Sequence, residues 1–264
     1  MSTAGAGMVL ADKEAGPSSF AIVRRVGRAH GLKAGHAGTL DPFATGLLVC
    51  LLGRATRLAR YLVGLDKRYV ATIRLGVRTA TGDSEGEELE QTPLPEAADI
   101  LALQGEVELE VPAASAVKID GERAYRLHRR GVAVEMPTRR STIHALEIVR
   151  LEPPELVLGL HVSSGTYVRA IADFLGGHCT ALRRTAVGEL TVDEAAEGTL
   201  RPPLDALPHL LRIELSAEEE TLVRTGRPLG GRALEGPVAL VHGETLVGVG
   251  RGDGHVIRPE TILA

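Results

Sequence analysis

The segment that most constrains this chain runs from Gly35 to Leu48 and reads GHAGTLDPFATGLL. It sets a single acid, Asp41, between a glycine-containing loop and a run of small apolar residues. Pro42 biases the residue before it away from helical backbone, and proline is itself favoured at the first position of a helix. We therefore expect Asp41 on a loop before a helical or mixed segment that begins near Pro42. By pattern alone, its carboxylate would simply cap that helix.

Length and composition indicate one large or two small folded domains. Of the 264 residues, 44% are hydrophobic but only 3% are aromatic, and tryptophan is absent. The core must therefore consist of leucine, valine, isoleucine and alanine. The cysteines Cys50 and Cys179 form no CxxC pair or disulfide framework, which is typical of a reducing cytosol. The apolar run 43–52 is too short to cross a bilayer, and the first ten residues lack the features of a signal peptide. We expect a soluble, cytoplasmic protein with no membrane contact.

Charge is distributed unevenly along the chain. Although the net charge is −4, residues 24–68 hold nine Lys and Arg against two acids, and residues 118–140 hold seven against three. Residues 83–110 hold ten acids and no Lys or Arg, and these acids mask the two basic segments in the total. Basic segments of this kind are typical of surfaces that bind phosphates, although an unevenly charged solvated surface is the alternative.

Hydrophobic periodicity and turn residues predict several elements. In the first part of the chain they are a strand over 8–11, a helix capped by Ser18 or Ser19 and ended by Gly31, a strand over 67–76 with Tyr69 on its apolar face, and a loop over 79–87. Farther on, a strand over 156–162 precedes a glycine turn and a helix capped by Thr166 and ended by Gly176, with Tyr167 and Arg169 in its first turn.

A proline-rich segment, RPPLDALP at 201–208, suggests a domain boundary. After it, short apolar runs with glycine turns include a hairpin signal at His242–Gly243–Glu244. We therefore expect a catalytic domain over 8–206 and a small β-rich module over 207–264.

The run around Asp41 resembles the catalytic motif of the TruB family, the bacterial tRNA pseudouridine-55 synthases. Other segments are similar to further motifs of this family, in the same order along the chain. They are DKEAGPSS at 12–19, LDKRYVATIRLGVRTATGDSEG at 65–86, VPAASAVKIDGERAYRLHRRGVAVE at 111–135, SSGTYVRAIADFLG at 163–176 and ALRRTAVG at 181–188. The resemblance covers roughly residues 8–195, and the C-terminal part looks more loosely like a PUA-type RNA-binding module.

This resemblance implies a fold and an activity. The fold is the α+β pseudouridine synthase fold, with a large mixed, mainly antiparallel sheet flanked by helices and a PUA-like module at the C-terminus. The activity is isomerisation of uridine 55 in the T loop of tRNA, after the base has flipped out of its stack. The enzyme would be an isomerase that uses no cofactor and no metal and binds the T arm of tRNA. We expect a monomer without an obligate protein partner.

The resemblance also implies the central roles. Asp41 matches the catalytic aspartate, Tyr69 the tyrosine that stacks on the target base, and Arg169 the arginine that pairs with the aspartate. Isomerisation breaks the bond between the sugar and nitrogen 1 of the base, turns the base, and rejoins it through carbon 5. Glycosidases use two carboxylates because water must enter, whereas here the detached base returns, so one carboxylate can suffice. A neighbouring arginine would keep this carboxylate charged and oriented.

Four further residues have implied places near the base. His36 matches a histidine that helps to hold it, Tyr167 and Leu182 match residues that line the pocket, and Lys13 lies in the N-terminal motif. Without the resemblance, His36 would be an ordinary loop histidine. The alternating pattern would likewise make Tyr69 a core residue.

Some features depart from the family or leave alternatives open. Glu14 stands where the N-terminal motif usually has proline, and the chain between Asp173 and Arg183 is several residues shorter than in family members. The pair His178–Cys179 looks like a metal-binding fragment but lacks further ligands at usable spacing. Two other functions remain open: the catalytic subunit of an RNA-guided pseudouridylation complex, and a tRNA chaperone on the same fold.

Overall fold

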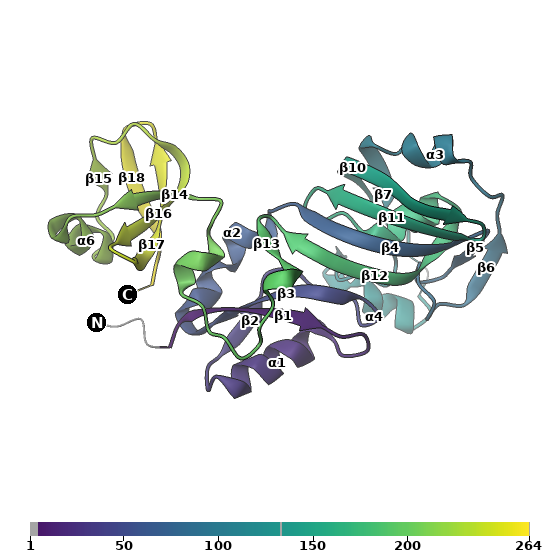
Figure 1. Ribbon diagram of the computed structural model, residues 1–264, viewed down its shortest axis with the longest axis horizontal. Coiled ribbons are helices and arrows are strands. Elements are labelled where there is room, and N and C mark those ends of the chain that lie inside the picture. The colour runs from purple at the N-terminus through teal and green to yellow at the C-terminus, as the bar shows by residue number, and fades with distance from the viewer. Residues whose placement is uncertain (1–4, 133, 264) are drawn as a thin grey trace. The chain divides into compact units, whose positions relative to one another are not determined.

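The computed structural model describes residues 5–132 and 134–263. The chain forms two compact units: the first comprises Met1–Leu65 and Ala186–Ala264, and the second comprises Asp66–Thr185. The first unit therefore contains both ends of the chain. Figure 1 shows the helices and strands, many of them labelled.

The N-terminal part of the first unit is a small antiparallel group of strands with one helix. Strand β3 pairs antiparallel with both β1 and β2, and α1 packs against β2. The elements in chain order are β1 (Gly7–Lys13), α1 (Ser19–Ala29), β2 (Ala34–His36), β3 (Thr45–Leu52), the 3₁₀ helix η1 (Gly53–Leu58) and α2 (Ala59–Val63). The predicted strand over 8–11 is confirmed within β1.

Helix α1 confirms the predicted cap and stop. Ser18 is the N-cap, and its hydroxyl oxygen accepts from the backbone N–H of Ala21. Gly31 follows the helix with a φ of +65°, a left-handed conformation that glycine adopts without steric cost.

The helix predicted near Pro42 is wrong, because the chain forms strand β3 there. The residues from Gly46 to Leu52 are all buried. Strands β1 and β2 pair with β3, its residues Leu47, Val49 and Leu51 lie in a buried apolar cluster, and α1 and η1 contact it. A strand buried on both faces shows no alternation of apolar and polar residues, so its short apolar run cannot be told from a buried helix. With no helix to cap, the interpretation of Asp41 as an N-cap is also wrong.

The second unit is built on an antiparallel sheet with the strand order β12-β4-β11-β10-β7 (Figure 1). Helix α5 packs against β4 and β7. The sheet strands and this helix are β4 (Lys67–Leu75), β7 (Gly105–Glu110), β10 (Thr138–Glu152), β11 (Glu155–Val162), α5 (Val168–Phe174) and β12 (Gly177–Val187). The strands predicted over 67–76 and 156–162 are confirmed as β4 and β11.

The second unit also contains two small hairpins and two short helices. Strands β5 and β6 form one small hairpin and β8 and β9 another, and α4 follows β9 directly. Their bounds are β5 (Val77–Thr79), β6 (Glu88–Gln91), α3 (Ala97–Leu101), β8 (Lys118–Ile119), β9 (Glu122–Arg123) and α4 (Ala124–Arg129).

The C-terminal part of the chain returns to the first unit and ends in a five-stranded sheet of order β14-β16-β17-β18-β15, drawn in green to yellow in Figure 1. The hairpin predicted at Gly243 is confirmed, since His242 of β16 pairs with Thr245 of β17. The elements are β13 (Leu190–Thr191), η2 (Val192–Glu194), η3 (Pro203–Ala206), β14 (Leu211–Glu214), α6 (Ala217–Arg224), β15 (Leu229–Gly230), β16 (Glu235–His242), β17 (Thr245–Asp253) and β18 (Val256–Ile262).

One buried apolar cluster in the first unit contains residues from both its N-terminal and its C-terminal strands. It contains Met8 and Leu51 of β1 and β3 together with Val241 and Leu246 of β16 and β17. A smaller cluster, which includes Leu240, lies within the C-terminal strands and α6. The domain boundary predicted between 206 and 207 therefore falls inside a compact unit, and it stays a prediction.

The expected class, an α+β protein with a mainly antiparallel sheet and a small β-rich C-terminal module, is confirmed. Among the described residues, no helix is long and apolar enough to span a bilayer.

Candidate active site

Asp41 lies in a turn that leads into β3. The backbone N–H of Ala44 donates to the carbonyl of Asp41 across 3.2 Å, and Thr45 begins the strand. The Asp41 side chain is half-buried. A turn that leads directly into a buried strand has its position fixed by the sheet. Such support holds a functional side chain more precisely than a free loop does.

The turn is held from one side by Lys13, the last residue of β1. This lysine is fully buried, and its ammonium donates to the carbonyls of Pro42 at 2.9 Å and Ala44 at 2.6 Å. The backbone N–H of Gly16 also donates to the carbonyl of Pro42, at 2.8 Å. Pro42, directly after Asp41, and Ala44, directly before β3, are therefore both bonded to the N-terminal segment.

Ser19 holds the residue before Asp41. Its side chain is buried, and its hydroxyl donates to the carbonyl of Leu40 while its oxygen accepts from the N–H of Leu40, both at 2.8 Å. Both neighbours of Asp41 in sequence are thus fixed by one segment, residues 13–19. The predicted place of Lys13, near the candidate catalytic residue, agrees with these contacts.

Electrostatics around the turn depend on the buried ammonium. Burial lowers the pKa of Lys13, and the negative charges of Glu14 and Asp41 oppose this change. Because an opposite charge favours ionisation, these two carboxylates support the charged form of the lysine.

His36 lies at the end of β2, where it pairs with Cys50 of β3, and its side chain is half-buried. His36 ends β2, and Asp41 lies within the connection from β2 to β3.

In the second unit, Tyr69 lies on β4 opposite Leu160 of β11. It shares a strand face with the buried residues Ala71 and Ile73, yet it remains half-buried itself. An aromatic ring at the edge of a packed sheet face can present its surface to a ligand while the sheet holds it.

Arg169 is a buried cation, with 2% of its side chain exposed. It donates to the carbonyls of Thr81 at 2.6 Å and Ala114 at 3.0 Å, and its Nη1 lies 3.9 Å from a carboxylate oxygen of Asp83. The two carbonyls fix the guanidinium, and Asp83 places one carboxylate beside it.

Helix α5 begins later than predicted. Tyr167 is the N-cap, and its side chain makes no capping bond, whereas the hydroxyl of Thr166 lies 3.3 Å from that of Ser163. Thr166 is not the cap, because its hydroxyl is used in the turn before the helix. Tyr167 therefore precedes the first turn, and Arg169 alone lies in it as predicted.

The other two predicted pocket residues have apolar surroundings. Tyr167 packs against a buried cluster of Val111, Ala124 and Met136. Leu182 is buried on β12.

The predicted site residues thus form two groups. Lys13, His36 and Asp41 belong to the first unit, and Tyr69, Tyr167, Arg169 and Leu182 belong to the second. The pairing of Arg169 with Asp41 stays a prediction.

Two residues of these groups escaped sequence reasoning. Ser19 was interpreted as an alternative helix cap, although the two adjacent serines allow one to cap and the other to serve elsewhere. Asp83 was counted only as one acid of a long acidic segment. It is buried, and its partner Arg169 is 86 positions away, a contact that no local pattern contains.

No group of three or more His, Cys, Asp or Glu side chains within the described ranges is arranged to hold a metal ion. The ring of His178 instead donates from Nδ1 to the carbonyl of Val77 at 2.7 Å.

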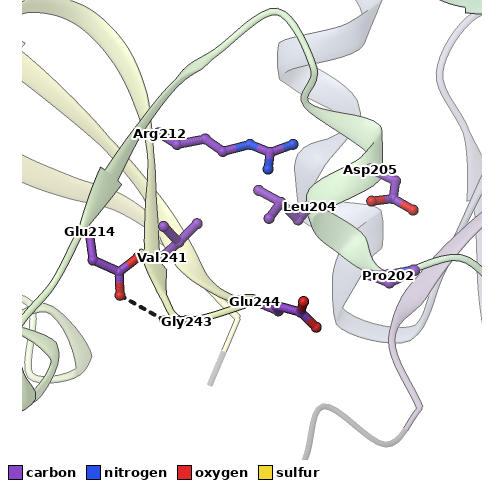
Figure 2. A pocket seen from close by; sticks show the side chains of 8 residues that line it. All are labelled: Pro202, Leu204, Asp205, Arg212, Glu214, Val241, Gly243 and Glu244. Carbon is purple, nitrogen blue, oxygen red and sulfur yellow. Dashed lines mark hydrogen bonds between the residues drawn. The ribbon is translucent and has the colours of Figure 1, made fainter.

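A pocket of about 490 Å³ lies elsewhere in the first unit, between η3 and the C-terminal strands (Figure 2). Its charged side chains are Asp205, Glu214 and Glu244 against a single Arg212. None of the predicted site residues lines it, and its acidic character does not suit a polyanion such as RNA.

Comparison with known proteins identifies similar sequences and folds. Residues 24–168 match the family model described as TruB family pseudouridylate synthase, N-terminal domain. The chain is 40% identical to the tRNA pseudouridine synthase B of Aromatoleum aromaticum, over 98% of this chain and 92% of that protein. It is 43% identical to the protein of the same name from Leifsonia xyli, over 90% and 88%.

The fold has a solved counterpart in a Cbf5–Nop10–Gar1 complex, with a TM-score of 0.73 over 98% of this chain and 85% of that one, at 22% identity. This likeness concerns the fold, which is the pseudouridine synthase fold with its C-terminal β module. On the extent of the sequence matches, the chain belongs to the TruB family of pseudouridylate synthases.

Proposed function

We propose that this protein is a stand-alone tRNA pseudouridine synthase that converts uridine 55 of the T loop to pseudouridine. The observation that carries the proposal is the 40% identity to a tRNA pseudouridine synthase B over nearly the whole of both chains. The enzyme is an isomerase, since the product has the same atoms as the substrate. A tRNA substrate agrees with the two basic segments and with the cytosolic location predicted from the sequence.

Asp41 is the catalytic group of the proposal. Its carboxylate attacks or deprotonates at the ribose as the bond to nitrogen 1 breaks. The clamp from Lys13, Gly16 and Ser19 supports this role, because a positioned carboxylate needs no further ordering when the substrate arrives.

In this scheme Arg169 orients the Asp41 carboxylate and favours its ionised form. Its two carbonyl partners and the Asp83 carboxylate set the position of the guanidinium. A guanidinium of this kind can make a strong charge-assisted hydrogen bond to a carboxylate.

Tyr69 receives the flipped base. Extrusion of a base from its stack costs a few kcal/mol, and stacking on an aromatic ring returns about 1–3 kcal/mol. In this proposal His36 helps to hold the base, Tyr167 and Leu182 line its pocket, and Lys13 supports the turn. The chain acts as a monomer.

The test is release of tritium from a tRNA transcript labelled at carbon 5 of its uridines, with the purified chain alone. Carbon 5 forms the new bond to the sugar, so its hydrogen is released once per turnover. We expect about one equivalent from wild type and none from Asp41→Asn, with tRNA affinity retained within a few-fold. Activity in Asp41→Asn would contradict the assignment of Asp41.

The role of Tyr69 has its own comparison. Tyr69→Phe keeps the ring and should retain more activity than Tyr69→Ala, whereas equal losses would contradict stacking. The same assay separates the alternatives: an RNA-guided subunit or a pure chaperone would release no tritium from a bare transcript.

A further inference from the structure

Helix α1 carries a stripe of exposed residues that the proposed mechanism does not use. Phe20, Arg24 and Arg28 follow one another at intervals of four, which places them on one flank of the helix. We call these three residues the α1 stripe. Phe20 is 65% exposed, and the guanidinium carbon of Arg24 lies 5.8 Å from the centre of its ring.

The arginines of the stripe differ from their neighbour Arg25. Arg25 lies three positions before Arg28, beside the stripe rather than within it, and forms ion pairs with Glu14 at 2.6 Å and Glu197 at 2.7 Å. None of the ion pairs among the described residues includes Arg24 or Arg28. The stripe therefore presents two positive charges that no nearby acid offsets, beside an exposed aromatic ring.

The stripe begins at the Asp41 turn. Ser19, the residue before Phe20, is bonded in both directions to Leu40, which precedes Asp41. From Phe20 to Arg28 the helix rises about 12 Å, at about 1.5 Å per residue. This length spans more than one nucleotide of an RNA strand.

We propose that the α1 stripe binds the RNA strand that flanks the target uridine in the T arm. Phe20 stacks on an unpaired base, and Arg24 and Arg28 contact the phosphates next to it. Aromatic and arginine side chains are the usual partners of unstacked RNA bases, and the positive charge complements the strand. The inference rests on the proposed function, because a uridine bound at Asp41 brings its neighbours within reach of α1.

The experiment measures the affinity of the full-length protein for an unmodified T-arm stem-loop at several salt concentrations. The variants are Phe20→Ala, Phe20→Tyr and the double change Arg24→Ala with Arg28→Ala. Arg25→Ala is the control on the same helix, since it removes one positive charge that is already paired with Glu14 and Glu197.

We expect the double arginine variant to reduce the slope of log K against log salt by about 1.4, at about 0.7 for each lost phosphate contact. Arg25→Ala should keep the wild-type slope. Phe20→Ala should weaken binding about fivefold or more, the equivalent of about 1 kcal/mol of stacking, and Phe20→Tyr should restore it.

Equal slopes for the double variant and Arg25→Ala, with unchanged affinity for Phe20→Ala, would overturn the inference. Tritium release from the same stem-loop separates the two proposals. If wild type releases tritium while the variants bind normally, the stripe is not an RNA contact and the proposed function stands. If wild type releases none from either the stem-loop or full-length tRNA, the proposed function fails and this inference with it.

Discussion

At the scale of single residues, hydrogen bonds to its backbone tie the Asp41 turn to residues 13–19. Lys13 and Gly16 bind the carbonyls after Asp41, and Ser19 binds both backbone groups of Leu40. Each bond is to the backbone, so the clamp sets the direction of the aspartate without competing for its carboxylate.

Ser19→Ala tests this clamp. It leaves the N–H and carbonyl of Leu40 without their buried partner, which costs about 1–3 kcal/mol. We expect kcat to fall about tenfold or more with little change in KM, because a displaced catalytic group can cost up to about 10²-fold. The measurement is single-turnover tritium release together with urea unfolding.

The adjacent serine is the control. Ser18→Ala removes the cap of α1 and should cost about 1 kcal/mol of stability while leaving kcat unchanged. Ser19→Thr, which keeps the hydroxyl, should recover part of the activity. Equal losses of kcat in Ser18→Ala and Ser19→Ala would show a loss of folding rather than of positioning.

Glu14 forms an ion pair with Arg25. The hydrogen bond from Arg25 lowers the pKa of Glu14 from 4.5 to about 2. The ion pair therefore stabilises the fold above about pH 4.5, and this contribution is lost as the pH falls toward 2. Both side chains are nearly half exposed, so solvent limits it to about 0.5–1 kcal/mol.

We expect Glu14→Gln to lower the free energy of unfolding by this amount at pH 7, and the difference from wild type to shrink between pH 5 and 3. Urea unfolding across this pH range measures it. Glu135→Gln, at an exposed glutamate outside the described ion pairs, should show no such difference. A constant difference down to pH 3 would mean that the charge of Glu14 is not involved.

At the scale of elements, the β8–β9 hairpin presents the second basic segment. Its two-residue turn has positive φ at Asp120 (48°) and Gly121 (85°), the combination that suits a tight hairpin. Helix α4 follows at once, and the guanidinium carbons of Arg126 and Arg129 lie 5.9 and 5.7 Å from the ring of Tyr125. The conformation of the turn therefore affects the positions of Arg126 and Arg129.

Gly121→Ala should disturb this display. No atom lies within 4 Å of the added Cβ, so the cost is conformational, about 1–2 kcal/mol for a left-handed backbone. We expect tRNA affinity to fall several-fold with kcat at saturation unchanged, measured by filter binding and tritium release. Gly198→Ala, at an exposed glycine with equally open surroundings, should leave affinity unchanged. A loss of kcat without a loss of affinity would contradict this role of the hairpin.

At the scale of the whole molecule, the C-terminal strands complete a core that begins with β1. Leu246 of β17 lies in the cluster that contains Met8, whereas Leu240 of β16 lies in the smaller C-terminal cluster. Both leucines are almost fully buried. Substitution of each leucine therefore tests whether the C-terminal module is independent of β1.

We expect Leu246→Ala and Leu240→Ala each to cost about 2–5 kcal/mol of local stability. Only Leu246→Ala should also speed hydrogen exchange in β1, because only that leucine shares the core of this strand. Hydrogen exchange of β1 and β18 amides measures the effect. If neither variant alters β1, the C-terminal strands form an independent domain.

The sequence by itself determined the elements whose signals are local. The alternation in β4 and β11, the cap at Ser18 and the stop at Gly31 depend on neighbouring residues, and the structure contains them as predicted. The motif around Asp41 likewise identified the family without any structure. Contacts between distant residues were decided only by the tertiary structure.

Successive side chains of β3 are all buried from Gly46 to Leu52, so its sequence has no apolar–polar alternation that would distinguish a strand from a helix. The clamp of Ser19 on Leu40 and the burial of Arg169 among carbonyls of Thr81 and Ala114 join residues 21 to 88 positions apart. Such contacts arise from packing, and a hydrogen bond between distant segments leaves no periodic trace in the sequence of either one.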